Sequence, residues 1–249
     1  MTSCLSARSC LALAFSAAAA FAAPAPSTVL DLAGWKLTIP VGPARKPTEI
    51  PGADLVKGYT SDCFYVAPDG GVVFWAPVTG TTTATSHFPR SELREMKPNG
   101  SEFNWREADG VSVLSATCVV LQIPTQTGKT VIGQIHAKSI NLPLLKLAYQ
   151  KGEVVALVKS TSTSDVDTPY RLCEARLGER ISYEVRLERN RLSVSANGHA
   201  VSVTIADDWE PVTLYFKAGN YVQANGGSST DGGRVAFYAL SVTHRPFAP

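Results

Sequence analysis

The sequence predicts an all-β protein, a two-sheet antiparallel β-sandwich of jelly-roll type with a concave groove. From Val111 onward, short segments that alternate apolar and polar residues recur at regular intervals, and turn residues separate them. No stretch shows the periodicity of an amphipathic helix. Many short strands with turns between them are typical of a sandwich, and 249 residues suit a single domain of this kind.

Residues 1–23 are expected to form a secretory signal peptide. Arg8 supplies a positive start, and the apolar run 11–21 is too short to span a bilayer. Ala20-Phe21-Ala22 offers a small-residue cleavage pattern. We therefore predict that residues 24–249 form one mature, soluble domain, exported to the periplasm or the extracellular space.

The strands ahead of Val111 are expected to be few and short. They are predicted at 35–39, 63–66, 72–76 and 88–95, with loops at 41–58 and 79–86. The later strands are predicted at 111–123, 130–138, 144–150, 153–159, 183–188, 191–196, 200–205, 212–218 and 234–243. Asn197-Gly198 fits the two-residue turn of a β-hairpin, and the Gly- and Ser-rich segment 223–233 is expected to be a loop.

Composition excludes several classes of protein. A charged fraction of 18% and a formal net charge of +2 fit neither a disordered chain nor a nucleic-acid-binding tail. Three cysteines remain after signal cleavage, namely Cys63, Cys118 and Cys173, and their spacing matches no metal site. An oxidising compartment would allow one disulfide and one free thiol, and the sequence leaves the pairing open.

The segment 133–138 alternates polar side chains with small or apolar ones. In a strand, Gln134, His136 and Lys138 share one face, while Ile135 and Ala137 point into the core. An amide, an imidazole and an ammonium in one row are suited to a binding or catalytic site. A strand with a single histidine is nevertheless more often structural, so the interpretation depends on partners from other strands.

Two more strands carry polar faces. Arg90, Glu92 and Arg94 alternate along 88–95, where a carboxylate between two guanidiniums can orient both of them; the alternative is a solvated ladder of ion pairs. The third polar face follows 215–223 and consists of Tyr215, Lys217, Gly219, Tyr221 and Gln223. Gly219 stands where a side chain would block a close approach to the sheet. The alternative is that the tyrosine and lysine side chains only cover a face of the sheet.

Together the three faces predict a cationic trough that suits a polyanion with a charge on every monomer, such as a polyuronate. Arg and Gln donors on a uronate carboxylate would stabilise the charge that develops when the C5 proton is removed. His136 is a suitable base and Tyr221 a suitable acid, or both acid and base, for β-elimination without a metal or cofactor. Hydrolysis needs two carboxylates across one bond, whereas Glu92 and Glu95 fall on opposite faces of their strand.

Three segments resemble the signature blocks of polysaccharide lyase family 7, the alginate lyases. They are Arg-Ser-Glu-Leu-Arg at 90–94, Gln-Ile-His at 134–136 and Tyr-Phe-Lys-Ala-Gly-Asn-Tyr-Val-Gln at 215–223, in the order that the family has them. The segment 31–40 is similar to the first strand of the family, so the resemblance covers almost the whole mature chain. It implies a β-jelly roll whose concave sheet binds alginate, a polymer of mannuronate and guluronate.

The resemblance also implies roles for individual residues. Arg90 and Gln134 would neutralise the substrate carboxylate, with His136 as base and Tyr221 as acid. The residues expected to bind substrate or support those that do are Arg94, Glu92, Lys138, Lys217 and Gln223. The chain departs from the family at Asn220, where an aliphatic residue is common, and at Val222, where Asn is common.

We predict an alginate lyase that cleaves inside the polymer. We also predict that it favours guluronate-containing blocks, because Ile at position 135 accompanies that preference in the family. No metal, cofactor, nucleic acid or membrane partner is expected, and the protein is expected to be a monomer. The alternatives are a lyase that prefers mannuronate or another polyuronate, and a non-catalytic carbohydrate-binding module on the same fold.

Overall fold

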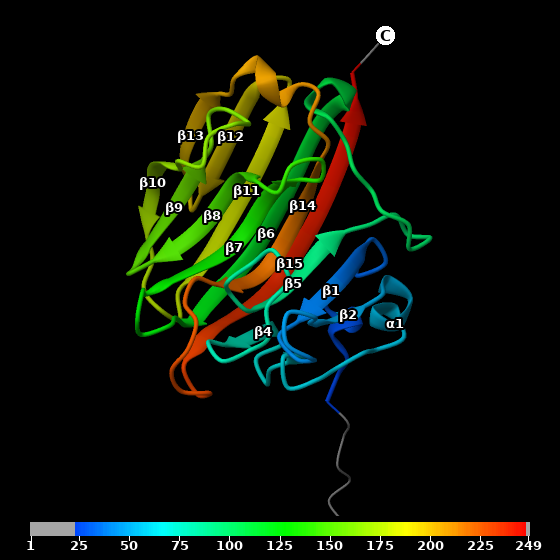
Figure 1. Cartoon of the computed structure of the whole chain (residues 1–249). Helices are drawn as coiled ribbons and strands as arrows, with labels where there is room; N and C mark the ends of the chain where they lie inside the picture. The colour runs from blue at the N-terminus through cyan, green and yellow to red at the C-terminus, as the bar shows by residue number, and fades with distance from the viewer. Residues whose placement is uncertain (1–22, 248–249) are drawn as a thin grey trace, which may run out of the picture.

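The computed structural model describes residues 23–247, so the predicted signal peptide lies outside the described residues apart from its last position (Figure 1). Two antiparallel sheets pack face to face, as predicted. The first sheet has the order β10 (Thr168–Glu174), β9 (Glu153–Val158), β8 (Pro143–Gln150), β7 (Lys129–Ala137), β14 (Leu214–Val222), β5 (Arg90–Glu95), β1 (Trp35–Ile39) and β2 (Thr48–Ile50).

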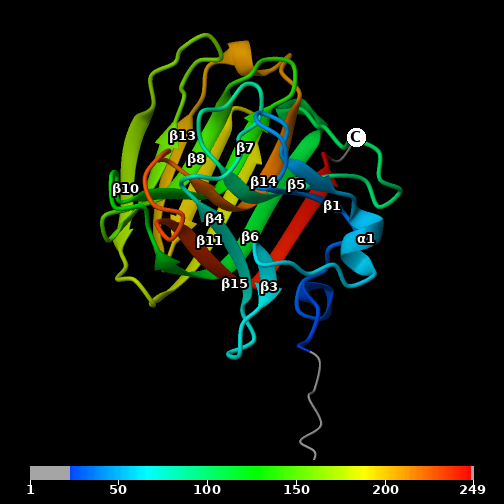
Figure 2. The same cartoon turned by 60° about the horizontal axis from the view of Figure 1, so that its bottom comes forward.

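The second sheet lies behind the first in Figure 1. Its order is β13 (His199–Thr204), β12 (Arg191–Ala196), β11 (Arg180–Glu188), β6 (Gly110–Gln122), β15 (Gly232–Pro246), β4 (Val72–Pro77) and β3 (Phe64–Val66). A short helix, α1 (Gly52–Val56), packs beside β1 near one edge of the first sheet (Figure 2). Three 3₁₀ turns complete the described elements, at Pro26–Thr28, Glu107–Asp109 and Asp207–Trp209.

Alternating apolar residues create the core between the sheets. Ile135 and Ala137 of β7 are 0% and 2% exposed and join that core, which confirms the orientation predicted for this strand. The Phe74 ring packs edge to face against those of Phe64 and Phe237, with centroids 5.0 and 5.2 Å away. Each such fully buried side chain contributes roughly 1.5–3 kcal/mol to the free energy of folding, so the core holds the two sheets together.

The turn between β12 and β13 is the predicted two-residue hairpin. Ala196 pairs with His199, and the φ angles of Asn197 and Gly198 are 47° and 85°. Positive φ at both central positions defines the type I′ turn, whose twist matches that of the strands it joins.

Three local predictions were wrong. The segment 41–58 is not all loop, because it contains β2 and α1. The edge strand β10 was not predicted at all; Pro169 and the charged residues Arg171 and Glu174 obscure its pattern, and an edge strand tolerates both features. The third error concerns the extent of β14, which was predicted at 212–218 and continues to Val222, with a shift of register against β7 between Ala218 and Tyr221.

Gly219 occupies that irregularity. Its φ is +137°, and a Cβ there would lie 2.8 Å from the Ser91 carbonyl oxygen and 2.9 Å from the Glu92 Cα. Only glycine therefore lets β14 approach β5 so closely, as expected for a bulge.

The three described cysteines are all buried and free, so no disulfide joins Cys63, Cys118 or Cys173. The disulfide that the sequence allowed is therefore not formed. No helix in residues 23–247 is long and apolar enough to cross a membrane.

Candidate active site

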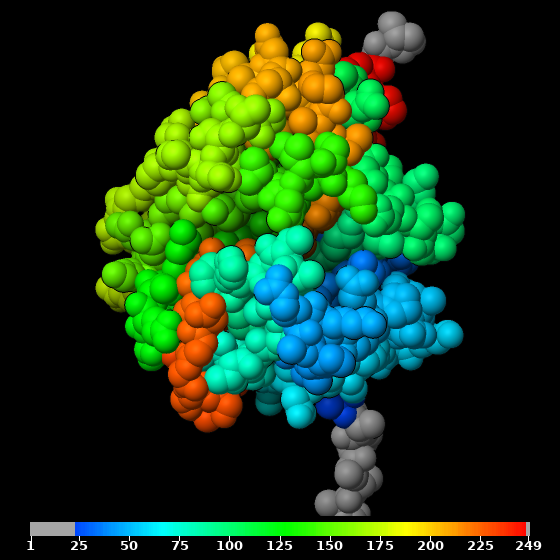
Figure 3. All heavy atoms as spheres, viewed as in Figure 1, coloured from blue at the N-terminus to red at the C-terminus, as the bar shows by residue number. Residues whose placement is uncertain are grey.

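A groove of about 430 Å³ crosses the exposed face of the first sheet. The surface is visibly hollowed between its green part and its cyan and blue parts (Figure 3). Eight predicted site residues line this groove: Arg90, Arg94, Gln134, His136, Lys138, Lys217, Tyr221 and Gln223. The predicted convergence of the three polar strand faces on one surface is thus confirmed.

Glu92 is the one predicted substrate contact that does not line the groove. It is 2% exposed, and its carboxylate accepts hydrogen bonds from Gln134 and Lys217 and pairs with Arg90 Nη1 at 3.2 Å. Burial alone would raise the pKa of Glu92, but Lys217 and Arg90 hold it below its usual value. Glu92 therefore lies beneath the groove as an anion that orients three donors, rather than as a direct contact.

Lys217 is nearly as buried, at 7% exposure, yet it lines the groove. Burial and the nearby Arg90 guanidinium lower the pKa of Lys217 to about 8, while Glu92 opposes that shift. Two cations and one carboxylate leave the floor of the groove with a net positive charge. Such a floor favours an anionic ligand, because the charges have already lost most of their water.

The Arg90 guanidinium lies over the Tyr221 ring, with its central carbon 4.0 Å from the ring centroid. Among the described residues its buried Nε has no hydrogen-bond partner. The side chain of Arg90 lines the groove and is 11% exposed, so its guanidinium can donate to an acceptor on a ligand.

His136 has a defined hydrogen-bonding environment. Its Nδ1 lies 2.8 Å from the Ala137 carbonyl oxygen, which can only accept, and 3.2 Å from the Tyr215 hydroxyl. We therefore assign the proton of neutral His136 to Nδ1, which leaves the lone pair on Nε2. Burial and the charge of Lys217 lower the pKa of His136 to about 4, so the ring is neutral near pH 7.

Tyr215 lies between His136 of β7 and Arg94 of β5. Its ring stacks on that of His136 with a centroid distance of 5.4 Å, and the Arg94 guanidinium carbon lies 4.2 Å from its centroid. Arg94 in turn donates to Asn104 Oδ1 at 2.6 Å, and Lys138 pairs with Glu102 at 2.8 Å. Arg94 is thus already engaged by protein groups, the Tyr215 ring and the Asn104 amide.

The Tyr221 hydroxyl lies 3.0 Å from Ser86 Oγ, in the loop that precedes β5. The backbone beside it is fixed by Asn220, which is fully buried. Asn220 accepts a hydrogen bond from Thr130 Oγ1 at 2.6 Å and donates to the carbonyl oxygens of Phe74, at 3.1 Å, and Gly233. The amide therefore ties the bulge of β14 to the second sheet, which gives a physical reason for Asn at this position.

Glu95 lies on the opposite face of β5 from Glu92, as predicted. Its carboxylate accepts hydrogen bonds from Trp105 Nε1 at 3.1 Å and Phe216 N at 3.0 Å and lies 2.6 Å from His244 Nε2. It cannot reach the groove, so the two carboxylates do not form the pair that glycoside hydrolysis requires. Residues 23–247 contain no cluster of three or more His, Cys, Asp or Glu that could hold a metal ion.

Sequence reasoning missed several groove residues. They include Lys36, Thr38, Thr83, Thr85, Ser86, Phe88, Asn141 and Lys146. The loop residues carry no local signal, because only the fold brings them to the groove. Lys146 could have been found, since it is the one charged residue in the apolar strand β8.

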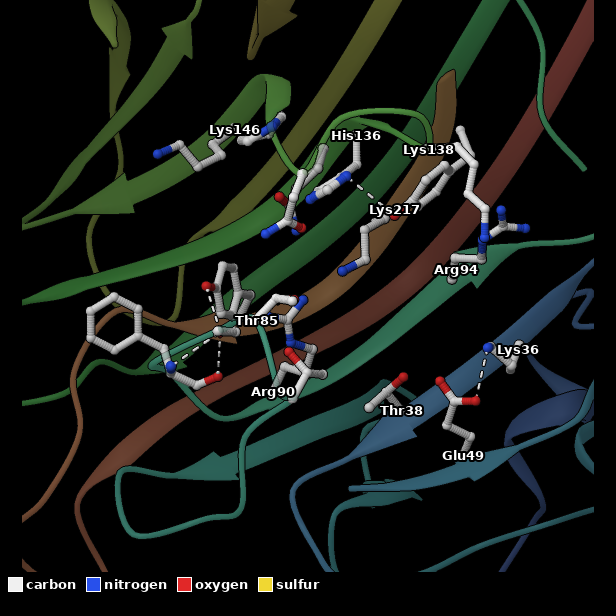
Figure 4. Close-up of a pocket in the computed structure, with 18 of the residues that line it drawn as sticks. Lys36, Thr38, Glu49, Thr85, Arg90, Arg94, His136, Lys138, Lys146 and Lys217 are labelled. Atoms are coloured by element: carbon white, nitrogen blue, oxygen red, sulfur yellow. Dashed lines mark hydrogen bonds and ion pairs between the residues drawn. The ribbon is translucent and has the colours of Figure 1, made fainter. Parts of the chain in front are cut away.

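The fold and the site together define a class of protein. It is a β-sandwich with a cationic groove across one sheet, a neutral histidine in the groove and a buried anion beneath it. Figure 4 shows Arg90, His136 and Lys217 facing the same space from three neighbouring strands. The arrangement can bind an extended anionic polymer and move a proton.

Comparisons with known proteins identify the family. The family model described as alginate lyase matches residues 30–244. An alginate lyase of Klebsiella pneumoniae is 31% identical over 92% of this chain and 94% of its own. The crystal structure of an alginate lyase from Pseudomonas aeruginosa superposes with a TM-score of 0.82, at 40% identity over 86% of this chain and 100% of that one.

A third relative has been crystallised with its substrate. This family 7 alginate lyase, A1-II′, in complex with substrate (GGMG), has a TM-score of 0.83 and 36% identity over 92% of this chain and 100% of its own. The chain therefore belongs to the alginate lyase family, and it is a polysaccharide lyase of the β-sandwich type.

Proposed function

We propose that this alginate lyase acts by metal-free β-elimination in the groove described above. The observation that carries the proposal is the convergence of Arg90, Gln134, His136 and Tyr221 over the buried Glu92. A uronate has a carboxylate next to its C5 proton, and removal of that proton places a second negative charge on the carboxylate. The reaction therefore needs hydrogen-bond donors at the carboxylate, a base at C5 and an acid at O4.

Arg90 and Gln134 are suited to be the donors. Arg90 lines the groove and has guanidinium donors beyond the Nη1 that pairs with Glu92, and the Gln134 amide has a second N–H beyond the one that Glu92 accepts. Because Glu92 orients both side chains before substrate arrives, little reorganisation is needed as charge develops on the carboxylate.

His136 is proposed as the base and Tyr221 as the acid. The Nε2 lone pair of His136 takes the C5 proton, the C4–O4 bond breaks, a C4–C5 double bond forms, and Tyr221 gives its proton to O4. Where the two protons lie on one side of the ring, Tyr221 can serve both steps. The complex of A1-II′ with substrate (GGMG) supports the choice of residue types, because that variant has one histidine replaced by asparagine and one tyrosine by phenylalanine.

The products of alginate cleavage test the chemistry. Elimination leaves an unsaturated end that absorbs ultraviolet light, and the yield should be the same with and without a metal chelator. Reducing ends without that absorbance would mean hydrolysis, and loss of activity in the chelator that returns with added metal would mean a metal-dependent reaction.

The preference for guluronate-containing blocks is also a proposal. It rests on Ile135, and on the relative A1-II′, which has been crystallised with product (GGG) and with substrate (GGMG). Ile135 is fully buried, so any effect on preference must pass through the packing beneath Gln134 and His136. Initial rates on poly-guluronate, poly-mannuronate and mixed blocks test it, and a higher rate on poly-mannuronate would contradict it.

We further propose cleavage inside the polymer, because the groove is lined from β2 to β8 and so crosses six strands. The viscosity of alginate should then fall early, before many unsaturated ends accumulate. An unchanged viscosity while unsaturated ends accumulate would indicate release from chain ends.

Export and a monomeric state complete the proposed function. The proposal of export rests on the signal-like residues 1–23, which lie almost entirely outside the described residues. The amino-terminal sequence of the secreted protein and its mass by light scattering test them. An uncleaved terminus or a dimer mass would contradict the respective point.

A further inference from the structure

Five neighbouring strands of the first sheet carry one row of polar residues. The register pairs Lys36 with Arg94, Arg94 with Lys217, Lys217 with Gln134, and Gln134 with Lys146. Neighbouring strands lie about 4.8 Å apart, which is comparable to the length of one sugar ring. Under the proposed function, on which this inference rests, a polyuronate lying across the strands meets a cationic or amide group at each step.

The row ends at β8, although the sheet continues for two more strands. In register, Lys146 is followed by Leu157 of β9 and Pro169 of β10, which carry no charge. No residue of β9 or β10 lines the groove. Lys36 and Lys146 lie on opposite sides of the labelled cluster in Figure 4, so Lys146 is the last cation at its end of the row.

That last cation is already paired with a carboxylate of the protein itself. Lys146 Nζ lies 2.5 Å from Asp167 Oδ2, and Lys159 Nζ lies 3.2 Å from Asp167 Oδ1. Lys159 is 3% exposed and also donates to the Asp165 carbonyl oxygen at 2.5 Å, so it cannot turn toward the groove. Asp167, just ahead of β10, thus holds two ammonium groups as a uronate carboxylate would.

We propose that Asp167 is a specificity-determining residue that occupies the place of a substrate carboxylate at the β8 end of the groove. By pairing with Lys146 it occupies the last cation of the row, so the polymer engages the row only as far as β7. The side chains of Lys146 and Asp167 keep 17% and 22% of their surface exposed, so a substrate carboxylate could reach Lys146 if Asp167 were neutral. Asp167, which lies outside the catalytic group, therefore sets the length of alginate that the groove binds.

The test compares Asp167→Asn with the parent on alginate oligomers of increasing length. For oligomers long enough to reach β8, we expect KM to fall about threefold to fivefold, the factor that one partly exposed ion pair contributes. Short oligomers should keep the KM of the parent, and kcat should change little at every length. Asp167→Glu should restore the parent's dependence on length, and Asp167→Ser replaces the asparagine variant if that one does not fold.

Two controls isolate the pair. Asp54→Asn makes the same change of charge at an exposed pair with Lys57 that does not line the groove, and it should leave the dependence on length unchanged. Adding Lys146→Met to Asp167→Asn should abolish the gain, because the freed cation is gone.

An unchanged KM at every length would overturn the proposal. A raised KM would do so as well, because it would mean that Asp167 only holds Lys146 in place for the substrate. These results differ from a failure of the proposed function, in which the parent itself would form no unsaturated products.

Discussion

At the scale of single residues, the site is organised by a group that does not line the groove. Glu92 is nearly inaccessible, yet Arg90, Gln134 and Lys217 all bond to it. Removing one partner of a buried charge network typically costs several kcal/mol, about 3–5, because the remaining charges stay buried without compensation. Glu92 therefore fixes the positions of these three donors and restricts the conformational freedom of their side chains.

The environment of His136 predicts the acid limb of the pH profile. The base must be neutral, and burial beside Lys217 lowers its pKa to about 4 from an ordinary value of 6.5. The kcat/KM of the free enzyme should therefore stay nearly constant as pH falls through 6.5 and decline only near 4. A limb near the ordinary value would contradict this environment.

The free energy of unfolding should also depend on the protonation of His136. Between the two values, unfolded chains bind a proton at this position and folded ones do not, so the free energy of unfolding decreases as pH falls through that window. Denaturant titrations of the parent and of His136→Asn measure the effect, and the variant should show a smaller decrease. Equal decreases in both proteins would mean that His136 is not the group involved.

At the scale of elements, regular strands were predictable and their irregularities were not. Strict alternation revealed the faces of β5 and β7, because one side of each strand is buried in the core. The edge strands β2 and β10 lack that alternation, since they bury little on either side. The bulge in β14 depends on contacts with Ser91 and Glu92 of another strand, which no local pattern can reveal.

The same limit applied to the site. The groove residues on β5, β7 and β14 followed from periodicity, and both their chemistry and the resemblance suggested their roles. The positions of Ser86 beside Tyr221 and of Glu92 beneath the groove are properties of the packed sheet. Glu92 was assigned to substrate binding because periodicity gives the face of a residue and not its depth.

The bulge leads to a prediction for Asn220→Leu. The substitution leaves Thr130 and the carbonyl oxygens of Phe74 and Gly233 without their amide partner. We expect a loss of about 3 kcal/mol in the free energy of unfolding, measured by denaturant titration, because buried polar groups lose their hydrogen bonds. Because Asn220 precedes Tyr221, kcat should fall more than KM rises.

The matched control is Asn190→Leu, which changes an exposed asparagine in a turn. It should alter stability by about 0.5 kcal/mol or less. An Asn220→Leu protein as stable and as active as this control would show that the amide does not position the bulge.

At the scale of the whole molecule, packing between two sheets replaces covalent cross-links. Cys63, Cys118 and Cys173 lie free in the interior, and burial raises the pKa of each thiol. The folded domain should therefore react slowly with thiol reagents. A core of buried aromatic and aliphatic residues joins the two sheets instead.

This arrangement predicts the behaviour of the folded protein under reducing conditions. Addition of a reductant should leave Tm unchanged, because no disulfide is present to break. A protein of residues 24–249, unfolded without reductant, should react with a thiol reagent at all three of its cysteines, Cys63, Cys118 and Cys173. A lower Tm on reduction, or a single reactive thiol, would mean that two of them had formed a bridge.

The central claim is that a histidine and a tyrosine on neighbouring strands of one cationic groove carry out elimination on alginate. The most direct test is the turnover of Tyr221→Phe, which removes only the hydroxyl and keeps the ring beneath Arg90. We expect kcat to fall about 100- to 10,000-fold, the usual contribution of a proton-transfer group, while alginate binding stays near that of the parent. A kcat within a few fold of the parent would contradict the mechanism.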